Sequence, residues 1–293
     1  LGDDAALLQM GDLRQVLSTD HLRGFTDDPV VMTRIAAVHA LGDIWAMGAA
    51  PQAAMVSLIL PRMSAELQER TLEEIMQTAG DVMNAAGAQI VGGHTSIGAE
   101  FTVGFSLTGI ANAAPITLGG AQVGDVLIVT KPLGTGVILA AEMQMRARGA
   151  DVAAAYASMS RPLMQDALAL AGAHAMTDVT GFGLAGHLSN MCRASNVGAE
   201  LDVQRVPLLN GALALSEEGV QSSLYPDNLS DALTLMNAPE TAHGRLMLDP
   251  QTAGGLLAAV PERDAGKALA DQGIGAVQIG RITDGPVRLK LIE

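Results

Sequence analysis

The sequence contains few lysines, and acids outnumber bases. Lysine occurs only at positions 131, 267 and 290 of the 293 residues, and 31 acids against 17 bases give a net charge of −14. A duplex nucleic acid is therefore not expected as a partner, because binding a phosphate backbone requires a basic surface. A polyphosphate ligand would have to be held by metal ions, backbone N–H groups and a few arginines.

Cysteine, aromatic residues and long apolar runs are also scarce. The single cysteine, Cys192, excludes an internal disulfide and is typical of the reducing cytoplasm, where we expect this protein. Cys192 lies on an apolar helix without an obvious base, so we predict a buried packing residue. No apolar run approaches the roughly 20 residues of a membrane span, so no membrane partner is expected. Aromatic residues make up only 2%, so aliphatic residues and methionine must build the core.

Strand-like and helix-like patterns alternate along two halves of the chain. In the first half, the patterns predict strands over 14–20, 53–61, 89–98 and 100–112 and helices over 26–48 and 65–87. The second half begins with a predicted strand over 125–134. It continues with helices over 136–148, 161–172 and 183–194, then later strands, a helix over 262–273 and a last strand pair. We predict an α+β protein of two domains, residues 1–113 and 114–293.

Four aspartates stand beside small residues at predicted ends of strands or helices. They are Asp4 in "GDDAA", Asp20 in "LSTD", Asp43 in "LGDIWAMG" and Asp178 in "MTDVTGFG". Asp43 falls late in its predicted helix, where the negative end of the helix dipole disfavours an acid. Carboxylates are the ligands that Mg²⁺ takes, and a bound cation would offset that cost. The same residues also suit turns and helix caps, so each aspartate alone leaves both interpretations open.

Two glycine-containing segments are candidate phosphate loops, and a third resembles them in composition. "VGGHTS" (91–96) is predicted to be a glycine turn after a strand, either approaching a phosphate or serving as an ordinary turn. "TKPLGTG" (130–136) lacks the spacing of a Walker A loop, so Lys131 is interpreted as structural or as a solvated charge. "LDPQTAGG" (248–255) pairs a carboxylate with a glycine turn. His187, nine residues after Asp178, is interpreted as a helix-surface or core-edge histidine.

Taken together, the motifs resemble one enzyme family. "GDDAA", "LSTD", "RIAAVHALGDIWAMG", "VGGHTS", "TKPLGTG", "AMTDVTGFGLAGHLSNMC" and "LDPQTAGGLL" occur in the order seen in selenophosphate synthetases (selenide, water dikinases). The resemblance extends over residues 2–293. "MTDVTGFGLAGHL" and "DPQTAGG" distinguish this family from its relatives: aminoimidazole ribonucleotide synthetase, thiamine-monophosphate kinase and a hydrogenase maturation factor.

The resemblance implies an enzyme that makes selenophosphate from selenide, ATP and water, releasing AMP and phosphate. It implies an N-terminal mixed sheet that pairs across a homodimer, and a C-terminal α/β sandwich domain. Mg²⁺ would be held by Asp4, Asp43 and Asp178. ATP would be contacted by two groups of residues: Asp3, Asp20 and Asp43, and then Gly93, His94 and Thr95 reaching in from the neighbouring subunit.

The sequence departs from the family pattern in two respects. The family's glycine-rich segment, with its cysteine or selenocysteine and lysine, is expected before Leu1, so no catalytic residue is assigned within the chain. His39 stands where the family usually has asparagine. We therefore expect residues 1–293 alone to hold nucleotide better than they turn it over. Two alternatives remain open: a small-molecule kinase of the same superfamily that releases ADP, and an inactive nucleotide-binding homologue.

Overall fold

The computed structural model describes residues 2–270, 273 and 275–292, which form two compact units. The first comprises Leu1–Pro115 and Ser160–Met164, and the second comprises Ile116–Met159 and Gln165–Glu293. Each unit contains one mixed sheet with helices, which confirms the predicted two-domain α+β class. None of the described helices has the length and hydropathy needed to cross a bilayer.

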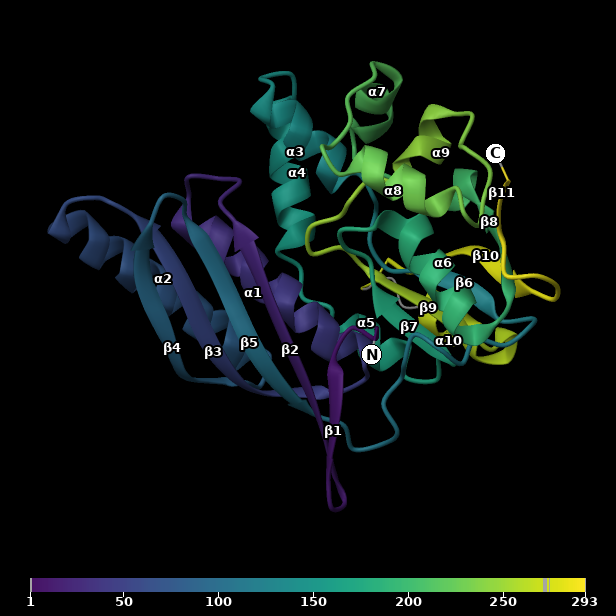
Figure 1. Ribbon diagram of the computed structural model, residues 1–293, viewed down its shortest axis with the longest axis horizontal. Coiled ribbons are helices and arrows are strands. Elements are labelled where there is room, and N and C mark those ends of the chain that lie inside the picture. The colour runs from purple at the N-terminus through teal and green to yellow at the C-terminus, as the bar shows by residue number, and fades with distance from the viewer. Residues whose placement is uncertain (1, 271–272, 274, 293) are drawn as a thin grey trace. The chain divides into compact units, whose positions relative to one another are not determined.

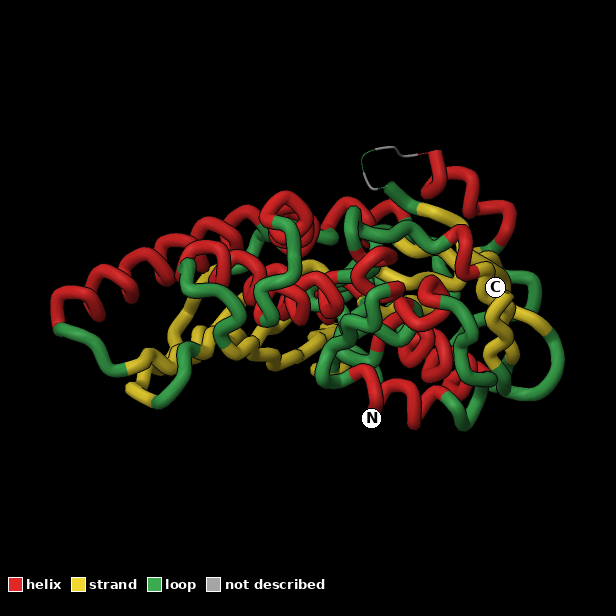
Figure 2. Tube along the Cα trace, turned by 90° about the horizontal axis from the view of Figure 1, so that it is seen from above, coloured by secondary structure: helices red, strands yellow, loops and turns green. Residues whose placement is uncertain are grey.

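The first unit is a five-stranded sheet with two long helices on one face (Figures 1 and 2). The strand order is β1-β2-β5-β3-β4, with β3 and β4 parallel and the other neighbours antiparallel. The strands are β1 (Ala6–Met10), β2 (Leu13–Arg23), β3 (Ala50–Pro61), β4 (Gln89–Gly98) and β5 (Thr102–Ile110). The helices are α1 (Pro29–Ala46) and α2 (Ala65–Ala85).

Local sequence signals explain where the two helices begin. Asp28 caps α1 by accepting hydrogen bonds from the backbone N–H groups of Val30 and Val31, and Pro29 occupies the first turn. Ser64 caps α2 by accepting from Leu67. α1 is buried on nearly all sides, whereas α2 is amphipathic and buries one stripe of residues. These helices cover one face of the sheet and leave the other face open.

Two predictions for the first unit are wrong. Residues 91–96 do not form a glycine turn, because β4 runs without interruption through Gly98 and pairs with β3 along its length. The second error is the omission of β1, a short exposed strand that forms a hairpin with β2. Both errors concern strands at the sheet edges, where burial imposes little hydrophobic patterning.

The second unit contains a six-stranded sheet of order β11-β8-β10-β6-β9-β7. Its strands are β6 (Val126–Val129), β7 (Ala175–Asp178), β8 (Gly198–Asp202), β9 (Leu256–Val260), β10 (Val277–Thr283) and β11 (Leu289–Ile292). The helices are α3 (Thr135–Met143), α4 (Gly149–Met159), α6 (Gly183–Ser195), α7 (Ala212–Glu217), α8 (Tyr225–Ala232), α9 (Ala242–Leu246) and α10 (Glu262–Ala270). A further helix, α5 (Met164–Ala169), begins at the last residue of the first unit. Of these helices, α4 and α7–α9 were not predicted from the sequence. The predicted helix end at residues 271–272 lies outside the described residues.

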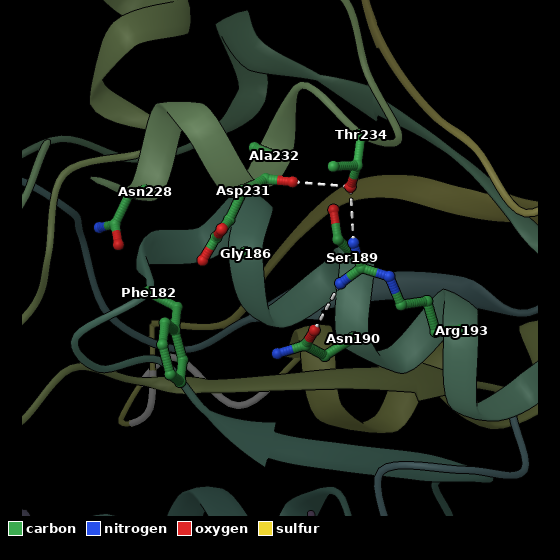
Figure 3. Close-up of a pocket in the computed structure, with 9 residues that line it drawn as sticks. All are labelled: Phe182, Gly186, Ser189, Asn190, Arg193, Asn228, Asp231, Ala232 and Thr234. Atoms are coloured by element: carbon green, nitrogen blue, oxygen red, sulfur yellow. Dashed lines mark hydrogen bonds between the residues drawn. The ribbon is translucent and has the colours of Figure 1, made fainter. Parts of the chain in front are cut away.

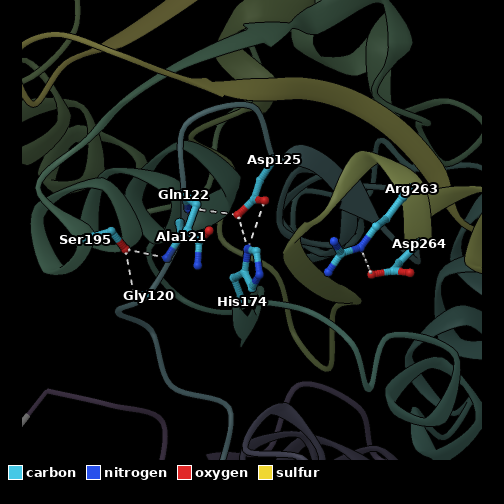
Figure 4. A network of polar contacts seen from close by, with 8 residues as sticks. All are labelled: Gly120, Ala121, Gln122, Asp125, His174, Ser195, Arg263 and Asp264. Carbon is cyan, nitrogen blue, oxygen red and sulfur yellow. Dashed lines mark hydrogen bonds and ion pairs between the residues drawn. The ribbon is translucent and has the colours of Figure 1, made fainter.

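A polar network fixes the chain that leads into β6 (Figure 4). The hydroxyl of Ser195 accepts hydrogen bonds from the backbone N–H groups of Gly120 and Ala121, both at 3.0 Å. The buried Asp125 carboxylate accepts from the N–H of Gln122 at 2.8 Å and lies 2.9 Å from Nδ1 of His174. The segment before β6 is therefore anchored to the end of α6 and to the start of β7.

Candidate nucleotide and metal site

Two predicted metal ligands come together in the first unit. Asp43 lies in the last turn of α1, and Asp4 lies in the bend before β1. Their carboxylate groups offer oxygens within 4.8 Å of one another, and both residues are half-buried. The hydroxyl of Ser18 on β2 donates to Oδ2 of Asp43. The last turn of α1 contains no basic residue. Two carboxylates at the negative end of a helix dipole form a local centre of negative charge, which favours a cation.

The predicted nucleotide-contacting acids lie near this pair in the chain. Asp20 is two residues beyond Ser18 on β2, so its side chain is on the same, helix-covered face of the sheet and is half-buried. Asp3 precedes Asp4 in the same bend and is exposed. Asp3, Asp4, Asp20 and Asp43 therefore belong to one side of the first unit.

The structure does not bring Gly93, His94 and Thr95 to this group within the unit. They lie on the edge strand β4, which is separated from β2 by two strands, or about 14 Å at ordinary strand spacing. The register pairs His94 with Ser57, whose neighbour in β5 is Gly104, opposite His21 on β2. The side chain of His94 therefore lies on the open face of the sheet, opposite the face of Asp20.

Gly93 in this motif has a packing role that was not predicted from the sequence. A Cβ atom on Gly93 would lie 2.1 Å from the carbonyl oxygen of Val56 on β3, whereas one on Gly92 would meet nothing within 4 Å. Gly93 therefore lets the edge strand approach β3 closely. A glycine that is required by strand pairing explains why this segment resembled a turn in the sequence.

Three of the sequence motifs meet at one end of the second sheet, where β6 and β7 end and β9 begins. β6 and β7 are each antiparallel to β9, so they run in the same direction. Lys131 follows the end of β6, Asp178 is the last residue of β7, and Gly254 and Gly255 immediately precede β9. The segments "TKPLGTG", "MTDVTGFG" and "DPQTAGG" consequently converge, although they are separated by long stretches of chain.

Asp178 ends a strand and does not cap a helix. It is 3% exposed, and α6 begins only at Gly183, without a side-chain cap. The segment after Asp178 packs tightly against the glycine pair. A Cβ atom on Gly254 would lie 2.1 Å from the carbonyl oxygen of Val179, and one on Gly255 would lie 2.4 Å from the backbone nitrogen of Lys131. The specific sequence "TAGG" is thus explained by close backbone packing.

Lys131 is buried, so the solvated-charge interpretation is excluded and the structural one holds. The side chain is 1% exposed, and its Nζ donates to the carbonyl oxygen of Ala253 at 2.8 Å. A buried lysine requires such polar partners because isolating its charge from water is costly. Its apolar surroundings in "LIVTKPLG" are the sequence signal that favours burial.

The "DPQ" segment holds the start of α3, a role that was not predicted from the sequence. Asp249 accepts hydrogen bonds from the backbone N–H groups of Gly136 and Val137, at the start of α3. Oε1 of Gln251 accepts from the N–H groups of Gly134 and Thr135 at 3.0 and 3.2 Å. Two distant side chains therefore satisfy the free N–H groups of this helix. Burial raises the pKa of Asp249 to about 7, against the opposing effect of these hydrogen bonds.

Two further side chains in this region are buried and neutral. His187 on α6 is 7% exposed, so it is a core residue, and burial lowers its pKa to about 4. Cys192, one turn further along α6, is fully buried, as predicted, and burial raises the pKa of its thiol to about 12. Neither side chain is a suitable nucleophile or base at neutral pH.

Both halves of the chain match one family by sequence. Residues 2–111 match the N-terminal domain of AIR synthase related proteins, and residues 122–292 match the C-terminal domain. The structure resembles that of the hydrogenase maturation protein HypE in complex with ATP, with a TM-score of 0.68 and 21% identity. That similarity covers 96% of this chain and 80% of the other, and it concerns the fold. The fold and the two matches define the class: a two-domain AIR synthase related protein.

The curated relatives narrow this class to one enzyme family. A selenide, water dikinase of Bdellovibrio bacteriovorus is 35% identical over 274 residues, which is 89% of this chain and 76% of the relative. One of Geobacter metallireducens is 36% identical over 289 residues, or 96% of this chain and 84% of the relative. The chain belongs to the selenide, water dikinase family, which confirms the resemblance stated from its motifs.

Proposed function

We propose that this protein synthesises selenophosphate from selenide, ATP and water and releases AMP and phosphate. The γ-phosphoryl group would pass to selenide, and water would then release the β-phosphate from the remaining ADP. The observation that carries this proposal is the 35–36% identity to selenide, water dikinases over most of both chains. Membership in this enzymatic family makes a phosphotransferase the best-supported activity.

We propose that the acidic pair Asp4 and Asp43 holds Mg²⁺ bound to ATP. The donors are carboxylate oxygens, which fit a hard cation, and they lie close enough together to share one ion. When bound, Mg²⁺ would neutralise charge on the phosphates and polarise them for transfer. Ser18 orients the Asp43 carboxylate through its hydrogen bond. Asp3 and Asp20 would contact the nucleotide beside this pair.

We propose Asp178 as the third metal ligand of the same site. This assignment rests on the family motif "MTDVTGFG" and on the position of Asp178 at a strand end, where the backbone is rigidly held. The tight packing of Val179 against Gly254 fixes the segment that carries the carboxylate. A net charge of −14 supports a metal-dependent site, since only three lysines of the chain are available to neutralise ATP.

We propose that two copies pair through the open face of the first sheet. Leu17, Met55 and Ile59 lie on this face and are between 38% and 52% exposed. His94 shares the face and would reach the nucleotide of the other copy together with Gly93 and Thr95. Met55→Asp should abolish the dimer in light scattering. Leu67→Asp introduces the same charge on α2, on the opposite side of the sheet, and should leave the dimer intact. A dimer that survives Met55→Asp would contradict the pairing.

The reaction is tested by ³¹P NMR of the natural-length protein, with the segment expected before Leu1, in the presence of ATP, Mg²⁺ and selenide and without oxygen. We expect a selenophosphate signal with AMP and phosphate rising in step. Asp43→Asn and Asp178→Asn should each weaken Mg²⁺-dependent ATP binding, whereas the exposed Asp81→Asn on α2 should not. ADP as the nucleotide product would indicate a small-molecule kinase. Tight ATP binding without turnover would indicate an inactive nucleotide-binding homologue.

The cytoplasm is the compartment we propose for this enzyme. The only cysteine of the chain is buried and protonated, so no disulfide contributes to stability. Selenide is itself a reductant and persists best under reducing conditions, which agrees with this location.

A further inference from the structure

A cavity of about 370 Å³ opens between α6 and α8 in the second unit (Figure 3). The residues that line it from α6 follow one face of that helix, and those from α8 face them. Its volume is in the range of small-molecule sites in proteins. The residues assigned above to nucleotide and metal do not line this cavity, so its role is separate.

The floor of the cavity contains a buried hydroxyl. Ser189 is 1% exposed, and its Oγ has no hydrogen-bond partner among the residues that the structure describes. Native proteins rarely leave a buried hydroxyl unpartnered, because the group loses its hydrogen bonds to water. Ser189 lines the cavity (Figure 3), so a ligand placed there could supply the missing bond.

Beside it, Asn228 is held in a fixed orientation. Its side-chain nitrogen donates to the carbonyl oxygens of Gly181 and Leu248 at 2.9 and 3.0 Å. The residue is buried at the same end of the cavity as Phe182 (Figure 3). Asn228 is thus positioned before any ligand binds, which lowers the entropic cost of binding.

Opposite charges line the cavity without pairing with each other. Arg193 of α6 donates through Nη1 to Oδ1 of Asn190 at 2.9 Å and through Nη2 to Oγ1 of Thr234 at 2.8 Å. These neutral partners orient the guanidinium and leave its charge uncompensated. Asp231 of α8 has no ion pair among the described residues (Figure 3). A ligand with one negative and one positive group would match both.

The remaining wall is an aromatic ring. Phe182 is 55% exposed, and it lines the cavity. A Cβ atom on Gly186 would lie 2.7 Å from Cβ of Phe182, so the glycine permits the position of the ring. An apolar side chain of a ligand would cover this exposed surface.

We propose that this cavity binds a free α-amino acid with an apolar side chain. Arg193 would take the carboxylate, Asp231 the ammonium group with the hydroxyl of Ser189 beside it, and Phe182 the side chain. The cavity lies outside the proposed metal site, so the proposal does not depend on the dikinase reaction, and its test measures binding alone.

The test is isothermal titration calorimetry of the full chain with L-phenylalanine and L-methionine. We expect binding at millimolar concentration or tighter (about 10 mM or below). N-acetyl-L-phenylalanine lacks the ammonium group and L-phenylalaninamide lacks the carboxylate, so both should bind at least about tenfold more weakly. Arg193→Met and Asp231→Asn should each weaken the binding of L-phenylalanine by a similar factor. Asp227→Asn, an exposed change on α8 outside the cavity, should leave the affinity unchanged.

Ser189→Ala tests whether the hydroxyl of Ser189 binds a ligand or stabilises the fold. Because its hydroxyl is unpartnered, the variant should melt at the same temperature as the wild type or higher, while binding L-phenylalanine more weakly. Absence of binding by both amino acids would overturn the proposal. Equal binding of the capped and free forms, or affinities unaffected by both Arg193→Met and Asp231→Asn, would also overturn it.

Discussion

Acid should destabilise this protein through one buried histidine, His187. In the folded protein, the backbone N–H of Thr180 donates to Nε2 of His187 at 3.0 Å, and Nδ1 lies 3.4 Å from Oγ1 of Thr177. Nε2 is therefore an acceptor and carries no proton. Protonating it would place a charge in a buried site and set two N–H groups against each other. Burial is the main cause of the lowered pKa, about 4.

The sign and size of the effect follow from proton linkage. The folded state holds a histidine of pKa about 4, whereas an unfolded histidine has a pKa of 6.5. Between these values the unfolded state binds a proton that the folded state does not, so stability falls as the pH falls. The stabilisation is fully present above pH 6.5. From pH 7.5 to pH 4.5, the expected loss of unfolding free energy is about 2–3 kcal/mol.

The assay is urea unfolding of the wild type and of His187→Gln across this pH range. Glutamine does not titrate, so the difference in unfolding free energy between the two proteins should change by about 2–3 kcal/mol. Other titrating groups are shared and cancel. His21→Gln, which removes an exposed imidazole from β2, is the control and should keep the wild-type profile. A pH-independent difference between wild type and His187→Gln would refute the reasoning.

Three further changes test the packing described above. Asp249→Asn removes a buried carboxyl group whose pKa is raised to about 7. The wild type loses stability as this group ionises with rising pH. The unfolding free energy of the variant relative to the wild type should therefore rise by up to about 4 kcal/mol between pH 4 and pH 8 in urea unfolding. Gly93→Ala should lower the unfolding free energy by about 1–3 kcal/mol, because its Cβ would meet the backbone of Val56. Gly92→Ala, whose Cβ would meet nothing, should lower it less, and equal melting temperatures of the two variants would contradict this. The thiol of Cys192 should react with Ellman's reagent only after unfolding, so rapid labelling of the native protein would exclude its burial.

Much of the fold could be predicted where the local signals agree. α1 has an aspartate cap followed by proline, and α2 has a serine cap and an amphipathic stripe, so both helices were predicted close to their observed bounds. The long strands β2, β3 and β5 alternate in burial, as strands covered on one face should. The short helices α4 and α7–α9 lack such signals, because their positions depend on contacts with distant parts of the chain.

The candidate site also contains residues that could be predicted from the sequence and residues that could not. Motif order was sufficient to nominate Asp4 and Asp43, which the structure brings within ligand distance of one another. It was not sufficient for Asp249 and Gln251, because Gln251 bonds to Gly134 across 117 residues of sequence. A helix cap supplied by so distant a segment leaves no periodic or compositional signal near the helix itself. Glycine gave the least reliable signal, as the strand pairing of Gly93 demonstrates.

The two strings that distinguish this family combine ligand groups with residues that only hold the backbone. In "MTDVTGFG", Asp178 is the candidate ligand, whereas Gly183 has a φ of +69° and would place a Cβ 2.8 Å from the carbonyl carbon of Leu248. In "DPQTAGG", Gly254 and Gly255 meet Val179 and Lys131 at contact distance. Replacing these glycines should therefore weaken metal binding indirectly and lower stability at the same time. Replacing Asp178 with asparagine should weaken metal binding by removing a carboxylate ligand, while the glycine packing that holds the motif is unchanged. Comparing the loss of metal binding with the loss of stability in each variant therefore distinguishes a metal ligand from a residue that only holds the backbone of the same motif.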